Sequence, residues 1–221
     1  MLTMRADQAD GLRQLMASSP GRRLAVVGSA PKVGASSVVQ NLAAALQQQG
    51  RQVRMHDEHA ADASTPETDP GALLLIDAVR DPQGALSPLA AQADQILVVL
   101  RPDAESIKHA YACVKQLHYA HALQRIRVLI SQVTDASQAQ RILANLALTG
   151  SRYLALMLEP AGCVRADPRL LQARRLNLTV VEAYRTSPAA VDFLQLAADL
   201  QNWHWRMGST ECASVAAQTL H

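Results

Sequence analysis

The chain has 221 residues, a formal net charge of +2, 49% hydrophobic residues and only 3% aromatic residues. This length allows one core of α/β size, and the Ala-, Leu- and Val-rich apolar content favours helices packed on a sheet over an all-β design. Scattered basic residues argue against direct nucleic-acid binding, and three distant cysteines argue against a disulfide framework or a CxxC metal site. Since no apolar run approaches ~18 to 20 residues and no signal-peptide core is visible, we expect a cytoplasmic protein.

The first segment is predicted to be separate from the core. Residues 2–16 place apolar side chains near one side of a short amphipathic helix, and the SSPG break at 18–21 predicts a linker. Such a helix either folds back on the domain or is offered to a partner, and the sequence leaves both open. The expected organisation is a detachable helix over 1–17, a linker over 18–23, an α/β domain over 24–207 and a disordered tail over 208–221.

Residues 24–46 are the centre of the predicted fold. Leu24–Val27 form a short apolar run typical of a strand buried on both faces, and helical spacing begins at Ser36. A turn between such a strand and such a helix points backbone N–H groups and a helix N-terminus at its ligand. This is a phosphate-binding geometry, and an ordinary strand-to-helix turn is the alternative.

The turn GSAPKVGASS has the pattern of a phosphate-binding loop with altered charges. In a working loop, glycines let the backbone approach the phosphates, a lysine neutralises the β and γ oxygens, and a hydroxyl binds magnesium. Here Ala35 stands where that lysine would be, and Lys32 is the only cation of the turn. The expected nucleotide-contacting residues of the turn are Gly28, Lys32, Gly34, Ser36 and Ser37.

Carboxylates follow the next two predicted strands. Residues 53–55 lead into Asp57, and the aliphatic strand 73–76 ends at Asp77. Nucleotide-binding α/β proteins place a magnesium-directed carboxylate at this position, although Asp77 is equally suited to cap the next turn. We therefore add both aspartates to the expected cofactor-binding residues and assign magnesium to Ser36 and Asp77.

The rest of the chain alternates regularly between strands and helices. Helices of this length between strands imply right-handed crossovers and a mostly parallel sheet flanked by helices. After a loop at 60–71, we expect strands at 96–100, 126–130, 153–158 and 179–181, a turn at 159–162, and helices at 104–117, 137–148, 168–174 and 188–205.

Three separated segments are similar to one protein family. DQADGLR at Asp7–Arg13 matches a DQAxxLR segment, Arg101–Leu117 looks like TPEPxSIxDAYALIK, and Ser151–Ala173 looks like RFLxxxLxxLGxIPxDxxxxxA. Over about residues 4–206 the chain therefore resembles the flagellar-number regulators FlhG and FleN, which are MinD/ParA-like P-loop ATPases.

The resemblance implies protein partners. In that family the DQAxxLR helix stimulates the signal-recognition-type GTPase that places the flagellum, and flagellar switch proteins or a transcriptional activator are further implied partners. A helix that merely caps the domain is the alternative. The implied partner-binding residues are Asp7, Gln8, Ala9, Leu12 and Arg13.

Several positions depart from the family pattern. Ala30 and Ala35 replace two lysines, and His59 replaces the second carboxylate of the D-x-D pair that begins at Asp57. Ser131 stands for the asparagine that reads adenine. Losing these contacts removes transition-state stabilisation worth several orders of magnitude in rate. We expect a pseudo-ATPase without catalytic residues that binds ATP and magnesium weakly, if at all.

Two further features carry alternatives. His56 and His59 have the chemistry to share a metal with Asp57, although a loop without cysteine makes this the weaker interpretation. Relatives end in a membrane-binding amphipathic helix, but the helix ending at 203–207 has few cations. Core packing is therefore favoured over transient membrane contact, for instance at the cell pole.

The sequence thus predicts a regulator of flagellar number or placement that binds and stimulates a signal-recognition-type flagellar GTPase. In this prediction the protein acts by binding a partner rather than through an ATPase cycle. The alternative is an active MinD/ParA-type ATPase that cycles between cytoplasm and membrane. A cellulose-synthesis or partition accessory protein of the same superfamily is disfavoured by DQADGLR.

Overall fold

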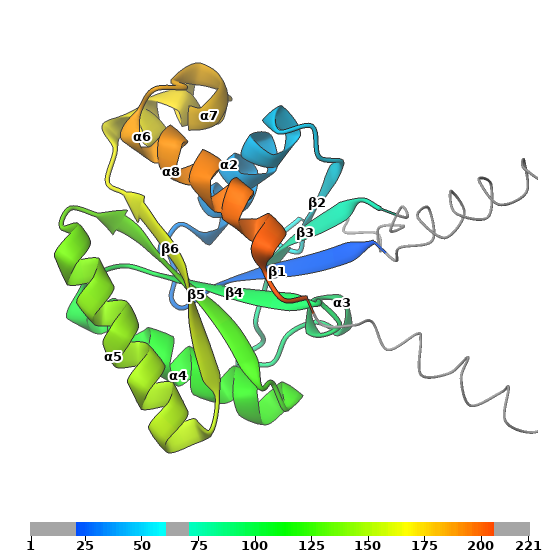
Figure 1. Ribbon diagram of the computed structural model, residues 1–221. Helices are drawn as coiled ribbons and strands as arrows, with labels where there is room; N and C mark the ends of the chain where they lie inside the picture. Colours follow the sequence, from blue (N-terminus) through cyan, green and yellow to red (C-terminus); the bar gives the residue numbers. More distant parts are fainter. Residues whose placement is uncertain (1–20, 61–70, 206–221) are drawn as a thin grey trace, which may run out of the picture.

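The computed structural model describes residues 21–60 and 71–205. Within them, six strands form one sheet in the order β2-β3-β1-β4-β5-β6, and every neighbouring pair of these strands is parallel (Figure 1). The parallel α/β fold predicted from the sequence is confirmed. The strands are β1 (Arg22–Gly28), β2 (Val53–Asp57), β3 (Leu73–Ala78), β4 (Gln95–Leu100), β5 (Arg125–Val133) and β6 (Met157–Arg165).

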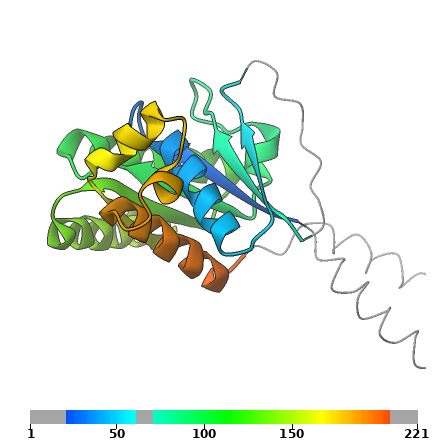
Figure 2. The same ribbon diagram turned by 90° about the horizontal axis from the view of Figure 1, so that it is seen from above.

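Helices cover both faces of the sheet (Figure 2). One face packs against α2, α6, α7 and α8, and the other packs against α3, α4 and α5. The sheet is therefore the middle of three layers. The helices are α2 (Ala35–Gln48), α3 (Pro88–Ala91), α4 (Ala104–His121), α5 (Ala136–Leu154), α6 (Pro168–Arg175), α7 (Val180–Ala183) and α8 (Pro188–Asp199).

Burial on both faces of the sheet explains why the sequence of the central strand β1 is apolar without alternation. Leu24 and Val26 belong to the core beneath α2 and α8, whereas Ala25 and Val27 belong to the core beneath α3 and α4. All four side chains are at most 1% exposed. A strand buried on both faces has no position for a polar side chain until it ends at the edge of the sheet.

Two predicted elements in the last third of the chain are wrong. The expected strand at 179–181 is the start of helix α7, because Thr179 and Glu182 form a reciprocal capping box that closes a helical turn. The expected turn at 159–162 lies inside β6, where the pairing with β5 shifts register rather than reversing the chain. Pro160 and Gly162 mark this irregularity and not a chain reversal.

The last described segment packs on the sheet. Helix α8 ends at Asp199 and continues as one 3₁₀ turn, Leu200–Asn202, so the predicted helix to about 205 is too long. The Trp203 ring is 8% exposed and lies against the Arg127 guanidinium, whose carbon is 4.3 Å from the ring centroid. Among the described helices, none has the length and hydropathy needed to cross a bilayer.

Candidate functional site

The loop after β1 has the backbone of an anion-binding turn. It runs from Gly28 to helix α2, and Gly34 at the N-cap has φ 97°, a left-handed conformation that favours glycine. No side chain caps the first turn of α2, which leaves its N–H groups available to an anion. Lys32 also has a positive φ of 62°, and its side chain is exposed.

The inside of the loop is filled by small and branched side chains. A Cβ atom on Gly28 would lie 3.3 Å from the Val33 Cγ2 atom and 3.5 Å from the Ala35 Cβ atom. Gly28 is therefore required by the close approach of the loop to its own strand. Ala35 packs partly against the core, in the place where related loops present a lysine to phosphate.

Ser131 holds the loop from the neighbouring strand β5. Its buried hydroxyl lies 2.6 Å from the Val33 carbonyl oxygen and 3.1 Å from the Leu100 carbonyl oxygen. Because a hydroxyl has a single proton, Ser131 cannot donate to a base while it donates to either of these carbonyl oxygens. The residue predicted as a substitute for an adenine-reading asparagine thus supports the shape of the loop.

Arg80 brings a second cation to the loop. Its Nη2 atom donates to the carbonyl oxygens of Gly28, at 3.3 Å, and Ser29, at 3.1 Å. Its Nη1 atom donates to the Gln116 side chain at 3.1 Å, which fixes the guanidinium from α4. Sequence reasoning missed Arg80. The available signal was a basic residue three positions after Asp77, at the edge of the sheet where the loop lies.

Asp57 and Asp77, each predicted at the end of a strand, meet at the same edge of the sheet. They are register partners of β2 and β3. Burial raises the pKa of Asp77 above its ordinary value of 3.8, while a hydrogen bond from Ser36 and the nearby His59 oppose the rise. The predicted magnesium residues Ser36 and Asp77 are therefore near enough for Ser36 to lower the pKa of Asp77.

The remaining residues singled out from the sequence lie along α2, beside Asp77 or outside the described part of the chain. The Ser37 hydroxyl lies 3.4 Å from the Asn41 amide nitrogen, one turn along α2, which directs it along the helix. His59 lies over Asp77, with its Nε2 atom 3.7 Å from the Asp77 Oδ1 atom. The predicted partner-binding residues at 7–13 lie outside the described part of the chain, as do the predicted tail at 208–221 and most of the loop at 60–71.

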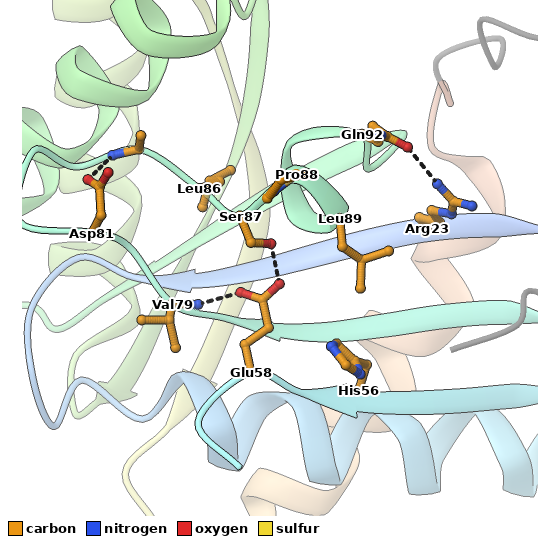
Figure 3. Close-up of a pocket in the computed structure, with 11 residues that line it drawn as sticks. Arg23, His56, Glu58, Val79, Asp81, Leu86, Ser87, Pro88, Leu89 and Gln92 are labelled. Atoms are coloured by element: carbon orange, nitrogen blue, oxygen red, sulfur yellow. Dashed lines mark hydrogen bonds between the residues drawn. The ribbon is translucent and has the colours of Figure 1, made fainter. Parts of the chain in front are cut away.

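A cavity of about 740 Å³ opens beside β2 and α3 (Figure 3). His56, Arg23 and Glu58 line it, and the figure shows the Glu58 carboxylate turned toward Ser87. Glu58 accepts hydrogen bonds from the Val79 N–H, at 2.9 Å, and from the Ser87 hydroxyl. Glu58 thereby connects the end of β2 to the N-terminus of α3, a role that the sequence did not reveal.

No protein-family model matches this chain. The antiactivator FleN of Pseudomonas aeruginosa is 28% identical over 111 residues, which span 50% of this chain and 40% of FleN. MinD of Aquifex aeolicus superposes with a TM-score of 0.62 at 13% identity, covering 83% of this chain and 98% of MinD. Pyrococcus horikoshii MinD complexed with Mg-ADP gives a TM-score of 0.60 at 12% identity, covering 81% of this chain and 96% of MinD.

The parallel sheet, the loop after β1 and these superpositions define a MinD/ParA-like P-loop fold. Within that class, half of the chain is similar in sequence to the antiactivator FleN. The resemblance stated from the sequence is confirmed at this level. The matched segment spans less than half of FleN.

Proposed function

We propose that this protein is a FleN/FlhG-type regulator that acts by contacting other proteins rather than by hydrolysing ATP. The observation that carries the proposal is a loop with the backbone of a phosphate-binding turn but with Ala30 and Ala35 at the lysine positions. Because the loop offers backbone N–H groups but neither lysine, the charge-assisted contacts to phosphate are missing, and we expect weak nucleotide binding and little hydrolysis.

The acidic edge of the site supports the same proposal. Ser36 and Asp77 are the oxygen ligands that we propose for a magnesium ion, and Ser36 is near enough to lower the pKa of Asp77. His59 occupies the position of the water-orienting carboxylate, and an imidazole cannot supply the same anionic acceptor. Pyrococcus horikoshii MinD is complexed with Mg-ADP, which makes Mg-ATP the cofactor to test here.

The proposed partner is a signal-recognition-type flagellar GTPase, bound and stimulated through Asp7, Gln8, Ala9, Leu12 and Arg13. FleN is an antiactivator, so a transcriptional activator is a second proposed partner, and flagellar switch proteins are a third. No described helix is long and apolar enough to span a membrane. We place the protein in the cytoplasm, with any membrane contact peripheral.

One experiment tests the proposed mechanism. GTP turnover by the partner GTPase is measured with the full-length protein, with Gln8→Ala and with the matched control Gln14→Ala, which lies outside DQADGLR. We expect stimulation by the wild type and by Gln14→Ala, and its loss in Gln8→Ala. Unchanged GTP turnover with the wild type would overturn the GTPase-activating role.

The alternative is an active ATPase that cycles between cytoplasm and membrane. The pairing of Asp57 with Asp77 at the carboxyl ends of β2 and β3 is the observation in its favour. Calorimetry with Mg-ATP and measurement of phosphate release separate the two functions. Micromolar affinity with steady phosphate release would establish the ATPase, whereas weak binding without turnover supports the regulator.

A further inference from the structure

Three potential metal ligands converge at the carboxyl ends of β2 and β3. One ligand atom each from Asp57, His59 and Asp77 lies within 4.8 Å of the other two. The aspartates are cross-strand partners, and the His59 backbone N–H donates to the Asp57 Oδ1 atom at 2.9 Å. The backbone therefore sets the positions of all three side chains before any ion arrives.

One carboxylate oxygen of the buried member of this group lacks a hydrogen-bond partner. Asp77 is 4% exposed, and its Oδ1 atom is buried without a hydrogen bond. The His59 Nε2 atom lies 3.7 Å from this oxygen, which is too far for a hydrogen bond. A buried carboxylate oxygen is costly unless a donor or a cation compensates it. This oxygen is directed at the group of ligands.

The neighbouring polar residues belong to a different cavity. His56 and Glu58 line the space beside α3, and Figure 3 shows Glu58 held by Ser87 and the Val79 N–H. They flank Asp57 in the sequence but are not members of the group. His56 is therefore a matched control for His59.

We propose that Asp57, His59 and Asp77 bind a divalent transition-metal ion of the zinc class in the absence of nucleotide. Magnesium prefers oxygen ligands alone, whereas an imidazole nitrogen together with carboxylates suits zinc and its neighbours. Zinc commonly takes three protein ligands and leaves a fourth position open. The ion adds positive charge beside a loop that lacks lysine at positions 30 and 35.

Small rearrangements suffice to form the site. Ligand atoms bound to one zinc ion at about 2.0 to 2.2 Å lie closer together than 4.8 Å, so the side chains must move inward. The His59 side chain is 55% exposed and is free to rotate at low cost. Asp77 supplies the fixed side of the site, because it is held within the sheet.

The test is metal binding by the full-length, nucleotide-free protein. Zinc is titrated by calorimetry, and cobalt serves as an optical probe of the ligand set. We expect one ion per chain, a cobalt spectrum without a thiolate charge-transfer band, and affinity at least tenfold lower in His59→Ala and in Asp57→Asn. His56→Ala should retain wild-type affinity.

The remaining outcomes overturn the proposal. These are an absence of binding, a thiolate band, unchanged affinity in His59→Ala, or equal losses in His56→Ala and His59→Ala. Both histidines lie near the sheet edge, and circular dichroism of each variant verifies that the comparison is made between folded proteins. The result is independent of GTPase stimulation, so the two proposals can fail separately.

Discussion

The Arg80 guanidinium donates a hydrogen bond to the Ser29 carbonyl oxygen at 3.1 Å and thereby ties the segment after β3 to the loop after β1. A cation is thus positioned at the base of a loop that lacks the two lysines of its relatives. Its hydrogen-bonding groups face the loop backbone, so its first effect is on the conformation of the loop.

Arg80→Ala is expected to loosen the phosphate-binding loop. The substitution removes charge-assisted bonds to Gly28 and Ser29, which together contribute about 2 kcal/mol to the free energy of unfolding. Chemical denaturation measures this loss. Gln116→Ala removes only the bond to the Nη1 atom and should cost less. Equal losses in the two variants would mean that the contacts with the loop contribute nothing.

Ala35→Lys is expected to strengthen binding of Mg-ATP. A lysine at this position restores a charge-assisted contact to phosphate worth about 2 kcal/mol, which corresponds to roughly 30-fold in the dissociation constant. Calorimetry with Mg-ATP measures the change. Gln40→Lys adds the same charge at an exposed position farther along α2 and serves as the control. If both lysines have the same effect, net charge rather than the loop governs the affinity.

Thr179→Ala is expected to lower the free energy of unfolding, because it removes the N-cap of α7. The Thr179 hydroxyl and N–H both donate to the Glu182 carboxylate, at 2.7 and 2.9 Å. Loss of such a cap costs about 1 kcal/mol of unfolding free energy. Thermal unfolding at neutral pH measures it. Thr186→Ala, at an exposed position in the following turn, should have a smaller effect.

The same cap makes a pH-dependent contribution to stability. Hydrogen bonds from Thr179 hold the pKa of Glu182 below its ordinary value of 4.5. The contribution is therefore complete above that unfolded-state value and is lost as the pH falls through the lower folded-state value. Glu182→Gln should remove this dependence. Denaturation midpoints of wild type and variant should converge in acid, and a constant difference down to low pH would contradict the assignment.

Trp203→Ala is expected to destabilise the fold by about 3 kcal/mol, since it removes a buried ring that packs on Arg127. Chemical denaturation measures the loss. If the Trp203 ring instead inserted into a membrane, the variant would keep its stability and lose flotation with liposomes. The exposed residue Leu171 provides a control, because Leu171→Ala opens no cavity.

The sequence was sufficient where a local pattern has one structural solution. The apolar run Leu24–Val27 predicts a strand buried on both faces, and the structure confirms this burial. The glycine pattern placed a turn before α2, and the aliphatic runs placed Asp57 and Asp77 after their strands, which the parallel sheet then brings to one edge. These predictions need only the chain's own periodicity and the geometry of parallel sheets.

Tertiary structure alone decided which distant side chains meet. Arg80 reaches the loop carbonyls and Ser131 supports Val33 because β3 and β5 lie near the loop in the folded sheet, across separations in sequence that no periodicity encodes. The capping box that makes 179–181 the start of a helix is local instead, and the Thr179-x-x-Glu182 spacing was the sequence signal for it. The sequence by itself determined the elements and the charges that the loop lacks. Side-chain contacts across strands determined how the site is held, because they depend on register and packing rather than on local preference.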